Sequence, residues 1–567
     1  MKNYTKYAPG YYPPPKCEMR WAKKDHIEKA PRWCSVDLRD GNQALIVPMN
    51  LDEKLSFFKI LCDIGFKEIE VGFPAASETE YEFLRTLIED DLIPDDITVQ
   101  VLTQSRKHII DKTFRSLVGA KRAVVHLYNS TSFAQRQQVF RASRDEIKEI
   151  AVTGAEMMNI YRDKYPDTDF TFQYSPESFT GTEPEFALEV CNAVIDVWKP
   201  SPEHPIIINL PATVEMSMPH VFANQIEYMS DNLRNRDSVI LSVHPHNDRG
   251  TGVADSELAV LAGAQRIEGT LFGNGERTGN VDIVTLAMNL FTHGVDPKLD
   301  FSDMPEIQKV YETLTGMKVG PRQPYSGMLV FAAFSGSHQD AIAKGMKWRK
   351  ESEPNRWTVP YLPLDPHDVG REYDGDVIRI NSQSGKGGVA FILEHNYGFI
   401  IPKDMRAEIG YMMKDISDRH HEELKPGDIY DAFAKEYIND FDHIDITDAS
   451  FGHGSSTKAE HSAVTVDMRV VIAGKVYNLT AEGNGRLDAV SNGLRQTDYH
   501  FDYKFITYSE NAISADSDSK AAAYVCIADT SGNKYWGVGT HADIILASVN
   551  ALVSALNRMN KRIHFVK

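Results

Sequence analysis

Residues 206–210 read Ile-Ile-Ile-Asn-Leu, an almost continuous apolar run that ends at Pro211. Such a run is typical of a strand that is buried on both faces, as in a parallel sheet. Other short apolar runs share this pattern: each ends abruptly in polar residues and precedes an amphipathic stretch of helical length. The predicted strands are residues 33–38, 68–73, 97–103, 122–128, 169–174, 206–210, 239–243 and 266–272.

The stretches between these runs, such as residues 51–64 and 183–198, have the periodicity of helices. Strand–helix units repeated eight times over about 280 residues fit a (β/α)8 TIM barrel better than an open sheet. No G-x-G-x-x-G follows the first strand, which argues against a dinucleotide-binding fold. No G-x-S-x-G is present either, which removes the usual serine-hydrolase interpretation.

The rest of the chain does not repeat this alternation of strands and helices. Residues 1–30 are rich in Pro and Tyr and are predicted to form an N-terminal arm, and 31–310 the barrel. Residues 311–426 mix helices with Pro-rich connections and are predicted to be subdomains appended to the barrel, up to a boundary at Pro426-Gly427. Residues 427–567 are predicted to form an α+β domain with two similar halves. Its predicted strands are 464–472, 475–479, 503–508, 523–528 and 534–538, and its predicted helices are 487–494 and 542–559.

Composition excludes several classes of protein. Lys and Arg number 61 against 80 Asp and Glu, a net charge of -19 that repels phosphate backbones and argues against a nucleic-acid partner. No apolar run reaches the length of about 18 residues that a membrane span needs, and the N-terminus lacks a signal-peptide core. The five cysteines are widely spaced without C-x-x-C, which argues against a disulfide framework and a thiolate zinc site. We therefore expect a cytoplasmic protein.

Polar side chains gather at the predicted carboxyl ends of the strands, where barrel enzymes carry their active sites. His244-x-His246 follows the seventh strand, and side chains two apart in a strand face the same side, so both imidazoles can reach one metal ion. Asp40, after the first strand, can supply a carboxylate, and Asn280, after the eighth, a neutral oxygen. Such a set is compatible with Mg²⁺, Mn²⁺ or Zn²⁺. Two histidines that only hydrogen-bond in a tight loop remain the alternative.

Several separated motifs, in this order, resemble the 2-isopropylmalate synthase family. They are Leu38-Arg39-Asp40-Gly41-Asn42-Gln43-Ala44-Leu45, Gln173-Tyr174-Ser175-Pro176-Glu177, Asn209-Leu210-Pro211-Ala212-Thr213, His244-Pro245-His246-Asn247-Asp248, Gly273-Asn274-Gly275-Glu276-Arg277-Thr278-Gly279-Asn280, Ser337-His338-Gln339-Asp340-Ala341 and Val359-Pro360-Tyr361-Leu362-Pro363. The C-terminal unit resembles the leucine-sensing domain of the same enzymes, so the resemblance covers almost the whole chain.

The resemblance implies a metal-dependent Claisen condensation of acetyl-CoA with 3-methyl-2-oxobutanoate, with Mg²⁺ as the first choice of metal. It implies His338 as the base, with Glu177 assisting and Tyr361 completing the site, and Arg39 can stabilise oxyanion charge. The positions implied for binding the keto acid are Gln43, Leu102, His126, Tyr128, Ser175 and Thr213.

The same resemblance implies a homodimer that leucine inhibits through residues 427–567. Glycines at Gly483 and Gly485 could let backbone amides approach a carboxylate, and the small residues Ala521 and Ala523 could leave room for an aliphatic side chain. Three alternatives remain: a related citramalate or homocitrate synthase, a lyase that cleaves a carbon–carbon bond in the same barrel, and a non-catalytic leucine-binding regulator.

Overall fold

The computed structural model describes residues 3–333, 335–373, 386–420, 424–453, 464–499, 501–514 and 519–564. It divides into two compact units. The first comprises Met1–Val330 with Leu364–Glu372, and the second comprises Phe331–Pro363 with Tyr373–Lys567.

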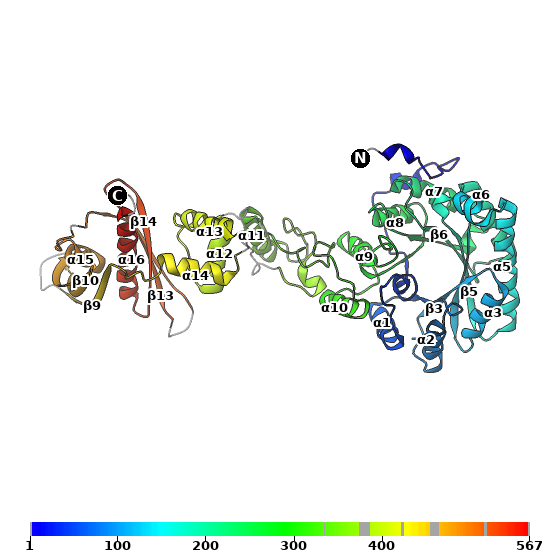
Figure 1. The fold of residues 1–567 in the computed structure, drawn as a ribbon, viewed down its shortest axis with the longest axis horizontal. Helices are drawn as coiled ribbons and strands as arrows, with labels where there is room; N and C mark the ends of the chain where they lie inside the picture. Colours follow the sequence, from blue (N-terminus) through cyan, green and yellow to red (C-terminus); the bar gives the residue numbers. More distant parts are fainter. Residues whose placement is uncertain are drawn as a thin grey trace. The chain divides into compact units, whose positions relative to one another are not determined.

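The first unit is built on a closed barrel in which β1 to β8 pair in sequence order and in parallel (Figure 1). The strands are β1 Arg32–Ser35, β2 Glu68–Gly72, β3 Thr98–Gln104, β4 Arg122–Ser130, β5 Asp169–Glu177, β6 Ile206–Ala212, β7 Val239–Pro245 and β8 Arg266–Gly269. Every residue of β6 and β7 is buried, as expected for strands that face side chains inside the barrel and helices outside it. The predicted (β/α)8 barrel is confirmed.

Helices surround these strands and follow them along the chain. They are α1 Leu51–Ile64, α2 Glu78–Glu89, α3 Lys107–Ser116, α4 Phe133–Gln135, α5 Arg144–Lys164, α6 Pro184–Trp198, α7 Pro219–Asn232, α8 Gly252–Leu261, α9 Ile283–Thr292 and α10 Met304–Thr315. The sequence sets the ends of α1 locally. Asn50 and Glu53 form a reciprocal capping box at its start, and Gly65 ends it with a φ of 108°.

Two predicted strands end earlier than expected, and both differences shape the mouth of the barrel. β1 stops at Ser35 because the carbonyl of Val36 accepts the N–H groups of Arg39, Asp40 and Gly41, which turns residues Asp37–Gly41 into one helical turn. β8 stops at Gly269, and a short turn follows at Leu271–Gly273.

The N-terminal arm lies against α7. The buried carboxylate of Glu227 accepts the N–H groups of Glu18 and Trp21 and the thiol of Cys17, and Arg20 pairs with Asp231. Among the described residues, no helix combines the length and the apolar character that a membrane span requires.

The second unit contains helices and two three-stranded antiparallel sheets. Its helices are α11 Gly336–Ser352, α12 Lys386–Tyr397, α13 Arg406–His420, α14 Pro426–Tyr437, α15 Arg486–Leu494 and α16 Ile544–His564. One sheet consists of β9 Ile444–His453, β10 Val464–Ile472 and β11 Lys475–Gly483, and the other of β12 Lys504–Ala512, β13 Ala521–Ala528 and β14 Lys534–His541.

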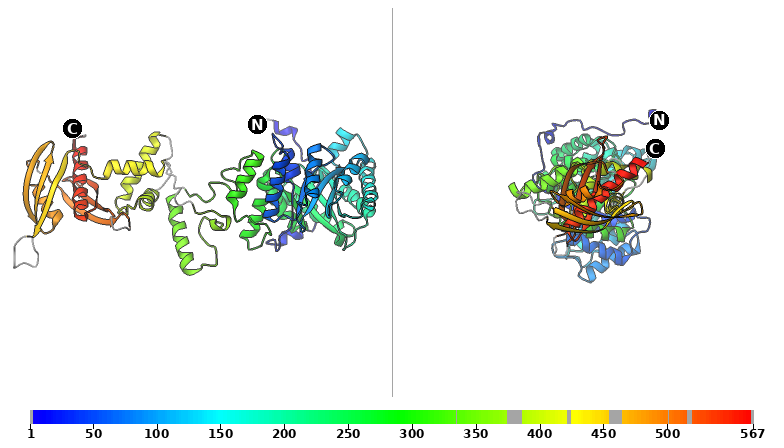
Figure 2. Two further views of the ribbon diagram at one scale, coloured as in Figure 1. Left: turned by 90° about the horizontal axis from the view of Figure 1, so that it is seen from below. Right: turned by 90° about the vertical axis from the view of Figure 1, so that its left-hand side faces the viewer.

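Each sheet is followed by a helix, so the predicted duplication is present. The sequence pattern did not reveal β9, which completes the first copy. The helix α16 packs along β13 and β14 (Figure 2). The helix can lie this close to β14 only where the strand has glycine, because a Cβ at Gly539 would lie 2.0 Å from the carbonyl oxygen of Ala547 in α16.

Candidate active site at the mouth of the barrel

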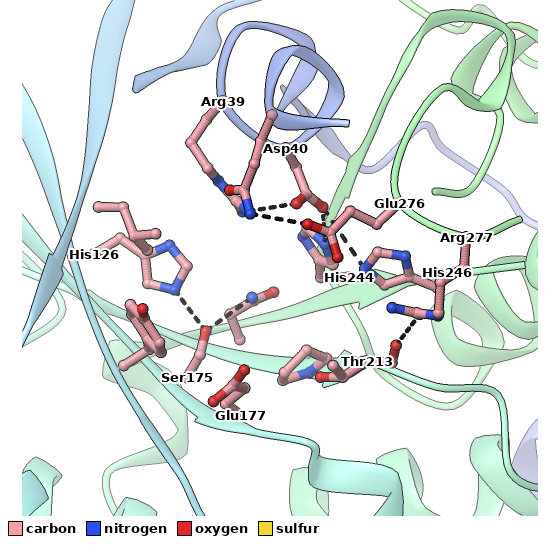
Figure 3. A pocket seen from close by; sticks show the side chains of 15 residues that line it. Arg39, Asp40, His126, Ser175, Glu177, Thr213, His244, His246, Glu276 and Arg277 are labelled. Atoms are coloured by element: carbon pink, nitrogen blue, oxygen red, sulfur yellow. Dashed lines mark hydrogen bonds and ion pairs between the residues drawn. The ribbon is translucent and has the colours of Figure 1, made fainter. Parts of the chain in front are cut away.

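A pocket of about 200 Å³ lies at the carboxyl ends of the barrel strands (Figure 3). It is lined by Arg39, Asp40, Gln43, Leu102, His126, Tyr128, Ser175, Glu177, Asn209, Pro211, Thr213, His244, His246, Glu276 and Arg277. The structure thus brings together in one cavity all the barrel residues predicted for the site except Asn280. This is the position at which barrel enzymes place their chemistry.

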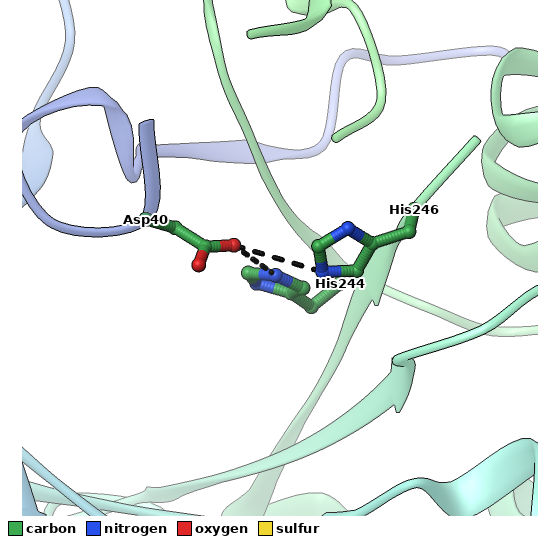
Figure 4. Close-up of side chains that lie close together, drawn as sticks. All are labelled: Asp40, His244 and His246. Carbon is green, nitrogen blue, oxygen red and sulfur yellow. Dashed lines mark hydrogen bonds and ion pairs between the residues drawn. The ribbon is translucent and has the colours of Figure 1, made fainter. Parts of the chain in front are cut away.

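The predicted metal ligands form a buried cluster on one side of this pocket. Oδ2 of Asp40 lies 3.2 Å from Nε2 of His244 and 3.6 Å from Nε2 of His246 (Figure 4). One ligand atom from each of these residues lies within 4.8 Å of the others. Asn280 reaches the same carboxylate, since its Nδ2 donates to Oδ2 of Asp40 over 2.9 Å.

The donor set of this cluster fits a divalent cation. Oδ1 of Asn280 is buried and has no hydrogen-bond partner in the structure. An unpartnered amide oxygen next to a carboxylate and two imidazoles is a set of oxygen and nitrogen ligands without a thiolate. The barrel therefore contains a buried Asp/His metal-binding group.

Charges around the cluster are arranged in pairs. Burial favours the neutral acid, but Nη1 of Arg39, 2.7 Å from Oδ1, holds the pKa of Asp40 well below its usual range. Burial also opposes a charge on His244, yet its bonds with Asp40 and Glu268 raise its pKa to about 9. Burial and the charge of His244 lower the pKa of His246 to about 4.

The loop after β8 depends on glycine to bring Asn280 into place. Gly279 has a φ of 92°, and a Cβ there would lie 1.8 Å from the carbonyl oxygen of Gly273. A Cβ at Gly275 would lie 2.9 Å from Oδ1 of Asn280. The motif from Gly273 to Asn280 is therefore a tight turn in which the backbone itself approaches Asn280.

The residues predicted to bind the keto acid line the same pocket as the metal ligands. Nε2 of His126 lies 2.7 Å from Oγ of Ser175, and the Tyr128 hydroxyl accepts from Nε2 of Gln104 over 2.7 Å. Oγ1 of Thr213 accepts the N–H of Ser178, and Nε2 of Gln43 donates to Glu276. His126 of β4, Ser175 of β5 and Thr213, directly after β6, all face this cavity (Figure 3).

Glu177 lies beside this group at the end of β5. Its carboxylate accepts a hydrogen bond from Oγ of Ser130 in β4. It lines the pocket together with the metal ligands, so a second carboxylate is available there.

Sequence reasoning did not assign some pocket residues. Glu276 and Arg277 lie inside a quoted motif, and Arg277 is tied to Asp248 and to the carbonyl of Thr213. Glu70 is fully buried in β2 and binds Nε of Arg39 and Nδ1 of His126. The available signal was the presence of Glu70 in a strand that is otherwise largely apolar, because a buried carboxylate must have partners.

His338 and Tyr361 belong to the second unit. His338 lies in the first turn of α11, and its imidazole stacks on the Tyr361 ring with centroids 4.0 Å apart. Both side chains are exposed. The two residues predicted from outside the barrel thus lie together.

The residues predicted to bind leucine have packing roles in the structure. Gly483 ends β11, and a Cβ there would lie 2.4 Å from the backbone nitrogen of Ala489. Gly485 precedes α15 in extended backbone. Ala521 and Ala523 lie on the face of β13 that packs in one apolar cluster with α16.

Three protein families match successive parts of the chain. Residues 30–310 match the HMGL-like family, 328–394 match the alpha-isopropylmalate synthase post-catalytic domain-like family, and 423–560 match the LeuA allosteric (dimerisation) domain. The barrel match covers the pocket and the metal ligands.

Curated relatives match over the full length. The chain is 60% identical over 561 residues to 2-isopropylmalate synthase of Desulfitobacterium hafniense, a match that covers 99% of both chains. It is 58% identical to that of Helicobacter hepaticus, covering 98% of this chain and 100% of the relative, and 54% identical to that of Clostridium acetobutylicum, covering 98% and 99%. The chain therefore belongs to the 2-isopropylmalate synthase family.

Proposed function

We propose that this chain condenses acetyl-CoA with 3-methyl-2-oxobutanoate and water to give 2-isopropylmalate and CoA, the first committed step of leucine biosynthesis. One observation carries the proposal: Asp40, His244 and His246 converge at a pocket in a chain that matches 2-isopropylmalate synthases over nearly its whole length. In this proposal residues 1–30 form an N-terminal arm, 31–310 the catalytic barrel, 311–426 the subdomains that complete the active site, and 427–567 the regulatory domain.

The metal site is proposed to hold one divalent cation on Asp40, His244, His246 and Asn280, with Mg²⁺ ahead of Mn²⁺ and Zn²⁺. When bound, such an ion supplies a Lewis acid that makes a keto carbonyl more electrophilic. Arg39 faces Asp40 and can place positive charge near the oxygen that becomes negative during the condensation.

The keto acid is proposed to bind against Gln43, Leu102, His126, Tyr128, Ser175 and Thr213. The pocket offers hydroxyl and imidazole groups for a carboxylate, and Leu102 offers an apolar contact for a branched side chain. This mixture of a few polar groups with an apolar wall is typical of small-molecule sites.

The carbon–carbon bond requires a base. We assign removal of a methyl proton from acetyl-CoA to His338, with Glu177 assisting and Tyr361 holding the imidazole through ring stacking. The resulting carbanion attacks the keto carbon, the alkoxide takes up a proton, and water then cleaves the thioester and releases CoA.

Residues 427–567 are proposed to bind leucine, to inhibit the enzyme and to form the homodimer. The support is the match of residues 423–560 to an allosteric dimerisation domain. A cytoplasmic location stays a prediction.

The test is a panel of 2-oxo acids with acetyl-CoA, in which released CoA thiol is measured. We expect the highest kcat/KM with 3-methyl-2-oxobutanoate. A preference for pyruvate would instead indicate a citramalate synthase, and one for 2-oxoglutarate a homocitrate synthase.

A further inference from the structure

A carboxylate lies beneath the metal ligands in the centre of the barrel. Glu268 in β8 is fully buried, and its two oxygens accept hydrogen bonds from five side chains on five strands. The donors are Nε2 of Gln100 (2.9 Å), Nε2 of Gln173 (2.8 Å), Nδ2 of Asn209 (3.2 Å), Nδ1 of His244 (2.8 Å) and Nη1 of Arg266 (2.8 Å). A buried carboxylate with this many donors is held in one orientation.

The bond to His244 determines which ring nitrogen faces the metal site. Glu268 accepts at Nδ1, so Nδ1 carries a proton and Nε2 points to Asp40. A carboxylate behind a metal-binding histidine fixes its tautomer and ring orientation. His246 lacks such support, because its Nδ1 is buried without a partner. The two histidines of the cluster are therefore supported differently.

The same carboxylate reaches the keto-acid side of the pocket. Nδ2 of Asn209 donates both to Glu268 and, over 3.0 Å, to Oγ of Ser175. Oγ of Ser175 is in turn bonded to His126. Glu268 thus lies at the junction of two chains of hydrogen bonds, one to the metal ligands and one to the residues proposed to bind substrate.

We propose that Glu268 is a positioning residue of the metal site, which holds His244 with Nε2 directed at the ion. This inference rests on the proposed function, since it requires the metal site described there. A purely structural role is the competing explanation, because Glu268 also pairs with the fully buried Arg266.

Arg266 supplies a matched control. Its Nε binds a second carboxylate, Glu68, which belongs to β2 and has no contact with the metal ligands among the described hydrogen bonds. Glu68→Gln removes one carboxylate partner of Arg266 and leaves His244 untouched. Glu268→Gln removes the other carboxylate and the anion that faces His244.

The experiment is calorimetric titration of Mn²⁺ into full-length apoprotein prepared with a chelator, with circular dichroism as the check on folding. We expect Glu268→Gln to weaken Mn²⁺ binding about 10- to 100-fold, and Glu68→Gln to leave it within about twofold of the parent. Equal affinities of Glu268→Gln and the parent would overturn the positioning role. Equal losses in both variants would also overturn it, in favour of charge compensation for Arg266.

A second variant covers the case in which Glu268→Gln does not fold. Glu268→Asp keeps the negative charge but withdraws it from Nδ1 of His244 by one methylene. Weakened Mn²⁺ binding in folded Glu268→Asp supports positioning, and parental affinity refutes it. If the parent apoprotein itself bound no Mn²⁺, Mg²⁺ or Zn²⁺, the proposed metal site would fail, which is a separate outcome.

Discussion

Asp40 and His244 are 204 positions apart in the chain, and Oδ2 of the first lies 3.2 Å from Nε2 of the second (Figure 4). The pair exists because β1 ends early in a helical turn, while β7 runs on to Pro245 and carries His244 to the same mouth. The cation site therefore needs ligands from both strand ends. The contribution of each ligand can be tested by substituting that residue alone.

Loss of either histidine should remove the metal. We expect His244→Ala and His246→Ala to leave less than one equivalent of divalent ion after dialysis and to lower turnover by orders of magnitude, because an open catalytic site has few ligands to spare. Elemental analysis of the protein and the thiol-release assay measure both effects. His204→Ala, an exposed histidine near the start of β6, is the control. Full activity of both variants after chelator treatment would place the metal elsewhere.

His338 should act on rate rather than on keto-acid binding. Removal of a general base costs about a hundred- to ten-thousand-fold in rate, so His338→Ala should depress kcat by that order with little change in the KM for the keto acid. Lys347→Ala, on the exposed surface of the same helix α11, should retain kcat. If His338→Ala kept the parent's turnover number, His338 would have no part in the mechanism.

Leucine should bind the full-length enzyme and lower its activity. Inhibition requires tighter binding to the less active state, with a coupling of typically about 1–3 kcal/mol. The same binding should raise the thermal midpoint with increasing leucine concentration, by mass action. Calorimetric titration and a thermal melt check both effects, and norvaline, whose side chain is unbranched and one carbon shorter than that of leucine, serves as the comparison ligand. No leucine binding by enzyme that is otherwise active would leave residues 427–567 a structural role only.

The turn that carries Asn280 should not tolerate a side chain. Gly279→Ala puts a Cβ against the carbonyl of Gly273, so we expect weaker metal binding and a loss of stability beyond the roughly 1 kcal/mol cost of a positive φ. Gly294 also has a positive φ, 80°, but a Cβ there meets nothing within 4 Å. Gly294→Ala should therefore lose only the stability that a positive φ costs an alanine. Chemical denaturation and Mn²⁺ titration compare the two, and equal losses would contradict the close approach.

Stability should depend on pH through Asp255 in α8. Burial, and next to it the charge of Glu215, raise the pKa of this carboxyl from 3.8 to about 8. In the folded chain Asp255 therefore keeps a proton that the unfolded chain releases. Its contribution to the free energy of unfolding is full below pH 3.8 and is lost as the pH rises to about 8.

Asp255→Asn stays neutral throughout, so its stability relative to the parent should rise across this window by on the order of 1 kcal/mol per pH unit and level off above it. Urea denaturation of both proteins from pH 5 to pH 9 measures the difference, in which the other titrating groups cancel. Parallel stability curves would show that Asp255 is ionised in the folded chain.

Local sequence determined the barrel and most of its active site. Runs such as residues 206–210 can only be buried on both faces, and eight of them separated by helices leave few alternatives to a closed parallel sheet. Because the carboxyl ends of parallel strands meet at one mouth, the order of strands along the chain is enough to assign residues such as Asp40 and His246 to one site. In the C-terminal domain, sequence patterns predicted β10 to β14 but did not reveal β9.

Only the tertiary structure decided what lies beneath that mouth. Glu70 and Glu268 lie within buried strands, and most of their partners come from other strands, such as Gln100 of β3, which donates to both carboxylates. Sequence periodicity reports which face a residue occupies, whereas the partner of a buried charge depends on barrel register. Likewise only the structure shows that Gly483 packs against α15 and Ala523 against α16, whereas their role in leucine binding stays a prediction. A small residue carries no chemical signal of its own, because what it makes room for is set by the neighbour that approaches it.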